Sequence, residues 1–347
     1  MKIVYSDKHI LRDSQTELFG GQLVEPFERP SRMDHILAQI NATGVGELIG
    51  EQDFGMEAIL KIHDADYVAF MQTVWDEWLA AGFEGEAMPT TWPARRMSDR
   101  IPDFVEGKLG YYSMSCETAL TQGTWPAAYA SAQVALTAAN LLVTGAQTAA
   151  FALCRPPGHH AAIDMYGGYC FLNNAAIAAQ HLLDKGAKRI AIVDVDFHHG
   201  NGTQDIFYKR NDVLFASLHG DPADAFPHFL GYSEETGQGD GVGFTRNYPM
   251  KPNTAFKEWR ATLVDALGHV ATYQPDAMII SLGVDTFEND PISFFKLKSD
   301  DFTTYGADIA KLGLPTMFVM EGGYDIGEIG VNTINVLQGF EAEQRKS

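Results

Sequence analysis

The feature that most constrains the fold is the alternation of short apolar runs with helical segments in the second half of the chain. These runs are typical of buried strands, and we predict strands at Ala149–Cys154, Ile190–Val195, Val213–Leu218, Met278–Leu282 and Thr316–Met320. Helices are predicted between and after them, at Asn174–Leu183, Lys257–Tyr273, Asp300–Lys311 and Glu328–Phe340. Such alternation predicts an α/β fold with a largely parallel sheet and helices on both of its faces.

The first half of the chain is less regular. A strand at Lys2–Tyr5 and helices at about 31–41, 56–79 and 127–144 are predicted, the second of these broken near His63, with Asp64 or Asp66 as a cap. Segment 82–126 contains four prolines and several glycines, and we predict a long inserted loop there. Loops of this length inside a domain are usually functional or form interaction surfaces. No repeat or linker-like composition is visible, so residues 1–347 are predicted to form a single domain.

Composition excludes some classes of function. The formal net charge of −20 argues against nucleic acid as a partner, because phosphate binding needs clustered Lys and Arg. The same charge is compatible with attracting a cationic substrate, or simply with a soluble surface. There is no apolar run long enough to span a bilayer and no signal-peptide pattern at the N-terminus, so we expect a cytoplasmic protein without a membrane partner. Three cysteines without CxxC spacing argue against a disulfide framework.

Four predicted strands are followed by chemically reactive side chains. The sequences are Arg155-Pro-Pro-Gly-His-His160, Asp194-Val-Asp-Phe-His-His-Gly-Asn201, Gly283-Val-Asp285 and Glu321-Gly-Gly-Tyr324. In an open α/β sheet, ligands bind just beyond the carboxyl ends of the strands. One such ending would be weak evidence, whereas four predict a site that is assembled from distant parts of the chain.

Asp196, His198 and Asp285 form a candidate metal site. Asp196 and His198 are two residues apart, so in extended backbone they point to the same side. Together with Asp285 they give three protein ligands and open positions for water and substrate, as catalytic metal sites require. The set suits Zn²⁺ or Fe²⁺. The alternative is that the aspartates cap helices and His198 is a packed core histidine.

His159 and His160 follow a stiff Pro-Pro-Gly turn and are candidates for general acid–base work. Asp194 and Asn201 are candidate hydrogen-bond partners for the two imidazoles, although the histidines could instead be further ligands or plain turn residues. Tyr324 follows a flexible glycine pair, and its hydroxyl could stabilise an oxyanion. A loop residue is the alternative for Tyr324, and Glu321 could be a buried structural carboxylate.

These motifs together resemble the signature of the histone deacetylase superfamily, and the resemblance covers nearly the whole chain in the right order. Within that superfamily the sequence is most similar to the bacterial acetylpolyamine amidohydrolases, in the stretch 15–21, in the 82–126 insertion and in Pro291–Lys296. The resemblance implies an arginase/deacetylase fold and a deacetylase that hydrolyses small, cationic N-acetylated polyamines.

The resemblance also assigns roles to residues. It implies a zinc site of Asp196, His198 and Asp285, the pair His159 and His160 with His160 as the base, and Tyr324 as the residue that polarises the carbonyl. It further implies a structural K⁺ site and a substrate channel, and it implies that the insertion packs a homodimer and narrows the entrance. The K⁺ site comprises Asp194, Asp196, His198, Ser217 and Leu218. Tyr169 and Phe226 are the implied walls of the channel, with Ile292 near its mouth, and Glu106 and Glu117 are the implied acidic residues at the entrance. Without the resemblance, both glutamates would be interpreted as part of a solvated loop face. Asn201 stands where class I relatives carry Asp, which is the class II pattern and leaves the basicity of His160 open.

Three other functions remain as alternatives. The same chemistry could act on acetyl-lysine in proteins or on another acylated amine, although a long insertion at the entrance argues against that. A binuclear manganese ureohydrolase of the arginase type would need further carboxylates where this chain has Gly200 and Phe287. A catalytically silent binding protein would not need every reactive residue to be present.

Overall fold

Eight parallel strands form the central sheet of this computed structural model, which describes residues 1–346. Their order is β4-β1-β5-β10-β9-β6-β7-β8, and every neighbouring pair is parallel. The strands are β1 (Lys2–Tyr5), β4 (Glu47–Gly50), β5 (Ala149–Ala152), β6 (Ile190–Asp194), β7 (Val213–Gly220), β8 (Thr245–Met250), β9 (Ala277–Leu282) and β10 (Thr316–Met320). The predicted parallel sheet is therefore confirmed. The predicted domain 1–347 ends on Ser347, which lies outside the described residues.

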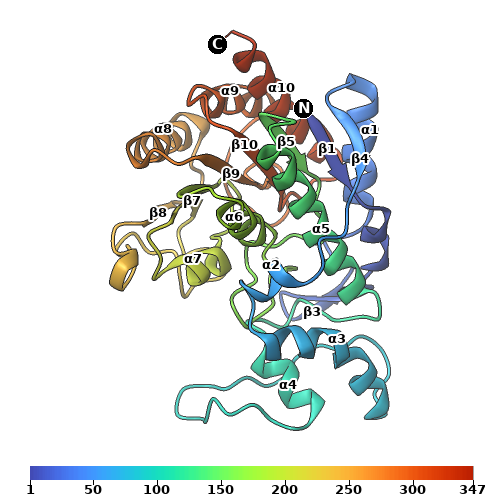
Figure 1. Cartoon of the computed structure of the whole chain (residues 1–347). Coiled ribbons are helices and arrows are strands. Elements are labelled where there is room, and N and C mark those ends of the chain that lie inside the picture. Colours follow the sequence, from blue (N-terminus) through green and yellow to red (C-terminus); the bar gives the residue numbers. More distant parts are fainter. Residues whose placement is uncertain (347) are drawn as a thin grey trace.

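Helices cover both faces of the sheet, as the alternation predicts (Figure 1). Successive side chains of a strand point to opposite faces, so Ile192 of β6 belongs to one core cluster and Val193 to the other. The Ile192 cluster includes residues of α2 (Glu57–Leu60), α3 (Ala65–Ala80), α5 (Thr124–Val143) and α6 (Asn174–Asp184). The Val193 cluster includes residues of α1 (Ser31–Thr43), α8 (Phe256–Tyr273), α9 (Ser299–Ala310) and α10 (Ile329–Gln344).

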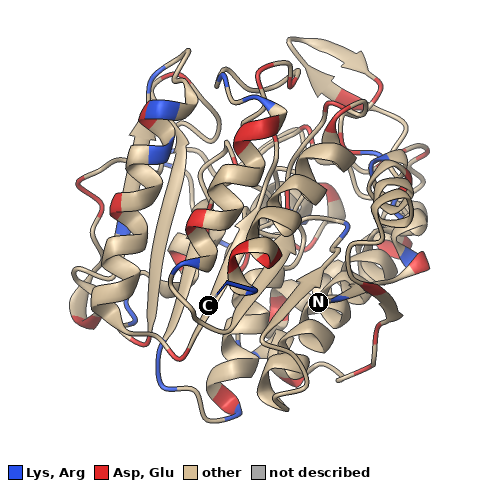
Figure 2. Ribbon diagram, turned by 90° about the horizontal axis from the view of Figure 1, so that it is seen from above, with Lys and Arg blue, Asp and Glu red and all other residues tan. Residues whose placement is uncertain are grey.

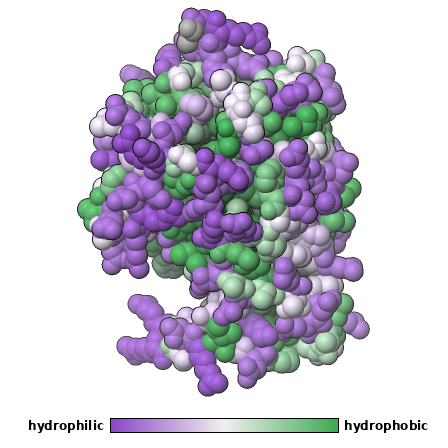
Figure 3. Space-filling model, viewed as in Figure 1, coloured by the Kyte–Doolittle hydropathy of each residue, from purple (hydrophilic) through white to green (hydrophobic). Residues whose placement is uncertain are grey.

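The insertion 82–126 is more ordered than predicted. It contains the short helix α4 (Val105–Tyr111), and α5 already begins at Thr124. Val105 and Leu109, four residues apart, bury one face of α4, but a helix of about two turns is too short to stand out as periodicity. Together with α3, this segment projects from the main body, and a hollow separates it from that body on the face shown (Figures 1 and 3).

Other elements were missed because the sequence signal is weak. Strands β4 and β8 lie at the two edges of the sheet, and β8 contains Pro249, which an edge strand tolerates. The remaining elements are short: the hairpin β2 (Glu17–Phe19) and β3 (Gln22–Val24), α7 (Asn201–Phe207), and the 3₁₀ helices Asp7–Leu11 and Gly239–Gly241. The predicted cap of α3 is correct in position only, since Asp64 is the N-cap residue but its side chain makes no capping hydrogen bond.

Charged side chains lie mainly on helices and loops around the sheet, and few lie on its central strands (Figure 2). Parallel strands buried on both faces read as nearly continuous apolar runs, which accounts for this distribution. Within residues 1–346, none of the helices combines the length and the apolar character needed to cross a bilayer.

Candidate active site

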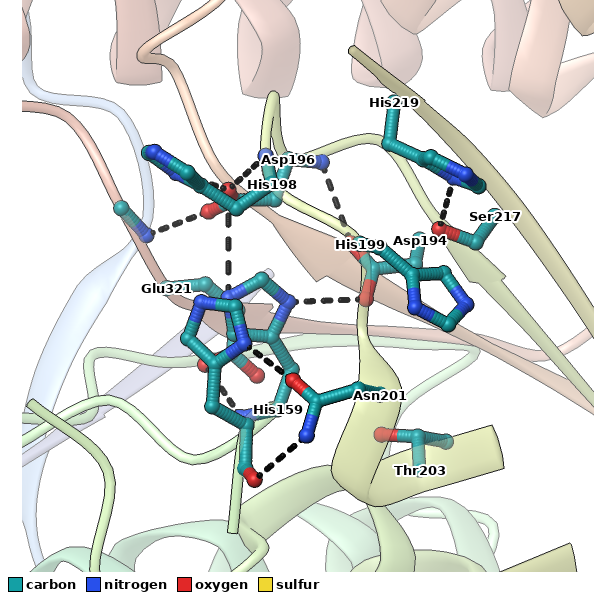
Figure 4. Close-up of polar contacts among 12 residues, drawn as sticks. His159, Asp194, Asp196, His198, His199, Asn201, Thr203, Ser217, His219 and Glu321 are labelled. Atoms are coloured by element: carbon teal, nitrogen blue, oxygen red, sulfur yellow. Dashed lines mark hydrogen bonds and ion pairs between the residues drawn. The ribbon is translucent and has the colours of Figure 1, made fainter. Parts of the chain in front are cut away.

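The four reactive motifs follow four adjacent strands. In the sheet order, β5, β10, β9 and β6 are consecutive neighbours. Because all four strands run in the same direction, their carboxyl ends meet at one edge, where α/β sheets bind ligands. Residues from positions 159 to 321 therefore lie together at this edge (Figure 4).

Asp196, His198 and Asp285 each bring one ligand atom to a common point. Nδ1 of His198 lies 3.3 Å from Oδ1 of Asp196 and 3.0 Å from Oδ2 of Asp285. Zinc bonds of about 2.0–2.1 Å at near-tetrahedral angles would separate ligand atoms by about 3.3 Å. The other carboxylate oxygens accept the backbone N–H groups of Gly322 and Phe197, both at 2.8 Å, which fixes their orientation.

The surroundings of these three residues fit a bound cation. Both aspartates are fully buried, and a buried carboxylate needs a compensating partner. Side chains at Gly283 or Gly322 would collide with the carboxylate of Asp196, so glycine keeps space around the ligands. A binuclear site of the arginase type would need a carboxylate at Gly200, where a side chain would meet the carboxylate of Asp194. A separate buried group, His159, Cys170 and Glu321, also brings three possible ligand atoms within 4.8 Å of one another.

His159 and His160 lie side by side below the metal-site residues, with ring centroids 4.1 Å apart. Nδ1 of His159 lies 2.9 Å from Oδ2 of Asp194, and its Nε2 lies 3.8 Å from Oδ1 of Asp196. Nδ1 of His160 lies 2.6 Å from Oδ1 of Asn201. Since an amide oxygen only accepts hydrogen bonds, Nδ1 of His160 carries the proton and Nε2 is left as the basic atom.

The two imidazoles differ in their electrostatics. Burial alone would lower the pKa of His159, but the carboxylates of Asp196 and Asp194 outweigh it and raise that pKa to about 10. Burial and then the positive charge of His159 hold the pKa of His160 well below its usual range. A cation bound at Asp196 would cancel part of the first effect. Paired titratable groups with pKa values pushed apart are characteristic of acid–base sites.

Tyr324 lines the cavity and is held more rigidly than its glycine pair suggests. Its ring packs edge-on against Tyr169, with centroids 5.6 Å apart, and the guanidinium of Arg32 lies 5.0 Å from its centroid. Nε of Arg32 donates to the carbonyl oxygen of Gly323 at 2.7 Å, and Nη2 donates to that of Glu321 at 2.6 Å. The turn that carries Tyr324 is therefore fixed, because both of these carbonyl groups are hydrogen-bonded to one buried arginine.

A cavity of about 330 Å³ gives access to these groups. Tyr169, Phe226 and Ile292, the predicted wall residues, all line it together with His160, His198 and Tyr324. The ring of Phe226 meets that of His160 edge-on at 5.2 Å.

The two predicted acidic residues of the entrance have different positions. Glu117 lines the cavity, and its Oε1 accepts hydrogen bonds from Ser115, Thr118 and the backbone N–H of Gly168. Among residues 1–346 all of its hydrogen bonds go to Oε1, so Oε2 remains available to a cationic group. Glu106 does not line the cavity. It is exposed on α4 and accepts a 3.3 Å hydrogen bond from Thr90, so its place at the entrance stays a prediction.

The residues predicted to hold a monovalent cation lie together at the ends of β6 and β7. Asp194 and Ser217 are register partners in these strands, and Leu218 follows Ser217. The Ser217 hydroxyl also contacts Nδ1 of His219 at 2.9 Å, a buried contact that the sequence did not suggest.

Comparison with known proteins agrees with this geometry. The histone deacetylase domain model matches residues 26–340. The chain belongs to the histone deacetylase family. It is 58% identical to an acetylpolyamine amidohydrolase of Mycoplana ramosa over 98% of this chain and 99% of the relative, and 54% identical to acetylpolyamine amidohydrolase 1 of Pseudomonas aeruginosa over 99% and 100%. A crystal structure of acetylpolyamine aminohydrolase from Burkholderia pseudomallei superposes with a TM-score of 0.94 at 38% identity, covering 99% of both chains.

In this histone deacetylase family chain, several residues of the site escaped prediction. Glu17, Phe294 and Asp290 either line the cavity or hold its walls, and Asp290 accepts the backbone N–H of Tyr324 at 2.8 Å. Their partners are distant in sequence, so no local pattern marks them. Weak signals existed for Glu17 and Phe294, because they lie in the stretches 15–21 and Pro291–Lys296 that resemble the acetylpolyamine amidohydrolases.

Glu17 attaches the β2–β3 hairpin to the cavity wall. Its Oε1 accepts the Tyr169 hydroxyl at 2.7 Å and its Oε2 accepts the backbone N–H of Phe27 at 3.1 Å. Burial raises the pKa of this carboxyl to about 6, and the two hydrogen bonds partly offset that rise.

We expect Glu17→Ala to lower the free energy of unfolding by about 1–3 kcal/mol, because it leaves the buried Tyr169 hydroxyl and the Phe27 N–H without an acceptor. Urea denaturation measures this, with Glu25→Ala as the control, since Glu25 is exposed in the same segment. A loss in Glu17→Ala no larger than that of the control would contradict the role of this carboxylate.

Proposed function

We propose that the protein is a metal-dependent amidohydrolase that removes the acetyl group from small N-acetylated polyamines. The observation that carries the proposal is one cavity lined by His198, His160, Tyr324 and the carboxylate of Glu117, in which His198 also belongs to the buried group with Asp196 and Asp285. The acetylpolyamine amidohydrolases that match this chain over nearly its full length support the same reaction class.

The catalytic roles follow from atoms that can reach an acetamide in this cavity. A Zn²⁺ ion held by the triad would polarise the carbonyl group and activate water for attack. Nε2 of His160 accepts the proton of the attacking water, while the hydrogen bond from Nδ1 to Asn201 keeps the ring oriented. His159, held by Asp194, completes the pair that returns a proton to the departing amine. The Tyr324 hydroxyl donates to the carbonyl oxygen as negative charge develops there.

The substrate preference follows from the cavity wall. Aromatic side chains suit the methylene chain of an acetylated diamine, and a carboxylate suits the ammonium group at its far end. In Glu117, three donors fix Oε1 and leave Oε2 for that ammonium group. A neutral amide of the same length lacks this interaction.

Steady-state kinetics with zinc-loaded protein test the proposal. We expect N-acetylputrescine and N-acetylcadaverine to be hydrolysed with a higher kcat/KM than N-butylacetamide or an acetyl-lysine peptide. Glu117→Gln is expected to lower kcat/KM for N-acetylputrescine by about 10–100-fold, since a hydrogen bond to a charged group contributes about 1.5–3 kcal/mol. The same variant should leave N-butylacetamide hydrolysis unchanged.

The matched control is Glu84→Gln, which removes an exposed charge from the same insertion. An equal rate on the peptide would contradict the proposed preference for free polyamines, and an equal loss on N-butylacetamide would show that Glu117 does not act through the ammonium group.

The proposal has further parts that rest on the family resemblance. The native metal is Zn²⁺, and K⁺ binds at Asp194 and Ser217. The whole chain acts as a single domain in the cytoplasm, and the 82–126 insertion pairs two copies into a homodimer. Sedimentation of the protein with and without residues 88–104 tests the last part.

A further inference from the structure

The carboxylate of Glu321 lies beneath the histidine pair and has no part in the mechanism above (Figure 4). It is fully buried. Its Oε2 accepts the backbone N–H of Gly158 at 2.7 Å and that of His159 at 3.1 Å. Successive backbone N–H groups in a turn form a concave site for an anion, and here one side-chain oxygen occupies it.

The backbone of Glu321 is itself fixed. Its N–H donates to the carbonyl oxygen of Leu282 in the neighbouring strand at 2.9 Å, and its carbonyl oxygen accepts Nη2 of Arg32 at 2.6 Å. The carboxylate therefore extends from a rigid point at the end of β10, which also carries Tyr324 three residues later. Such a fixed carboxylate can hold the turn that follows β5, which carries His159, at a constant distance from the turn that follows β10, which carries Tyr324.

The turn that receives this carboxylate has little freedom to adjust. A side chain at Gly158 would press on the backbone of Leu172 and Asn174, so the turn lies directly against that segment. The carbonyl oxygen of His159 accepts the N–H groups of Gly202 and Thr203 at 3.0 and 3.2 Å. The N–H groups of Gly158 and His159 in the same turn donate to Glu321, so the turn is hydrogen-bonded through both its carbonyl and its N–H groups.

A second feature sets Glu321 apart from an ordinary buried carboxylate. Among residues 1–346, its Oε1 has no hydrogen-bond partner. Burial raises the pKa of the carboxyl group to about 7, although His159 opposes this rise. A buried polar atom without a partner is unfavourable and calls for an explanation. An apolar side chain would avoid this penalty but could not hold the turn.

We propose that Glu321 is a positioning residue, whose carboxylate sets the place of the His159–His160 turn relative to Tyr324. The inference rests on the proposed function, in which His160 and Tyr324 must both reach the same acetyl group. Reacting groups displaced by about 1 Å can lose about 100-fold in rate. The length of the side chain, rather than its charge, is then the property that matters.

Two substitutions separate length from charge. Glu321→Gln keeps the reach and an acceptor oxygen but removes the charge, whereas Glu321→Asp keeps the charge and withdraws the carboxylate by one methylene. We expect Glu321→Asp to lose about 10–100-fold in kcat with little change in KM or metal content, and Glu321→Gln to stay within about fivefold of wild type. Thr333→Val is the matched control, an isosteric change at a fully buried residue whose hydroxyl reaches only Met320.

A second readout does not depend on turnover. Long-range ¹H–¹⁵N correlation spectra of histidine-labelled protein report the hydrogen bonds from Nδ1 of His159 and of His160. We expect these signals to shift in Glu321→Asp and to remain in Glu321→Gln and Thr333→Val. If wild type failed to hydrolyse acetylpolyamines, the proposed function would fall while the spectra still decided the position of the turn. Greater or equal loss in Glu321→Gln than in Glu321→Asp, or unchanged kcat and spectra in both, would overturn the proposal.

Discussion

The Asp285→Asn variant is expected to lose its bound metal and, with it, at least about 1,000-fold in turnover, since a metal ion supplies several kcal/mol of charge stabilisation to the reaction. The substitution barely changes size. An amide oxygen can still accept the N–H of Phe197, which now lies 2.8 Å from Oδ1 of Asp285. What disappears is one negative charge from a ligand set whose only other anionic member is Asp196.

Stability measurements distinguish loss of metal from loss of fold. Burial and the nearby charge of Asp196 raise the pKa of Asp285 to about 8 in the metal-free protein, so the two carboxylates repel each other when ionised. Metal-free Asp285→Asn should therefore melt at or above the temperature of metal-free wild type. A chelator should lower the melting temperature of wild type, because metal binds the folded state, and leave the variant unchanged.

Metal content by atomic emission completes this test. Glu288→Gln removes a partly buried charge three residues further along and should keep full metal content and activity. Stoichiometric metal and normal turnover in Asp285→Asn would exclude Asp285 as a ligand.

The grouping of the three candidate metal ligands was predictable because each of them follows a strong local signal. An apolar run followed by Asp196 and His198 indicates a buried strand, and it also indicates that candidate site residues lie at the carboxyl end of that strand. The parallel sheet then brings the candidate ligands together, since β6 and β9 are neighbours and place Asp285 beside Asp196 and His198. Sequence order alone could not give that adjacency, but four similar endings in one parallel sheet made convergence the expected result.

The residues that hold the walls and turns of the site in place were not predictable in this way. Tyr169 and Glu17 are 152 residues apart, and Arg32 holds backbone atoms about 290 residues away. Neither pair has a spacing that periodicity could reveal, because the contact exists only after the sheet and the hairpin are assembled. The missed strands β2, β3 and β4 are both short and largely exposed, so they lack the continuous apolar run that marks the equally short but fully buried strand β5.

For Glu106 the entrance role rests on resemblance alone. Its side chain is exposed on α4 of the single chain, and this position does not by itself test the role. The position of Glu117 is supported by the structure as well as by resemblance, because three hydrogen-bond donors fix one of its oxygens on the cavity wall.

Tyr324→Phe is expected to lower kcat by about 100–1,000-fold, the usual effect of removing one donor to a developing oxyanion. KM should change little, because the hydrogen bond strengthens as charge develops and contributes mainly in the transition state. The ring itself should stay in place. Tyr169 packs against it, Arg32 lies over it, and Asp290 holds its backbone N–H at 2.8 Å.

The control for Tyr324→Phe is Tyr305→Phe, which removes a buried hydroxyl that has no hydrogen-bond partner among residues 1–346. Both variants should retain full metal content and wild-type melting temperatures, so a loss of kcat confined to Tyr324→Phe can come only from the missing donor. Arg32 donates hydrogen bonds to the carbonyl oxygens of Glu321 and Gly323 and so holds the loop in place. The loop therefore cannot rearrange to supply another donor in place of the lost hydroxyl. Normal turnover in Tyr324→Phe would remove the tyrosine from the mechanism and leave carbonyl polarisation to the metal ion alone.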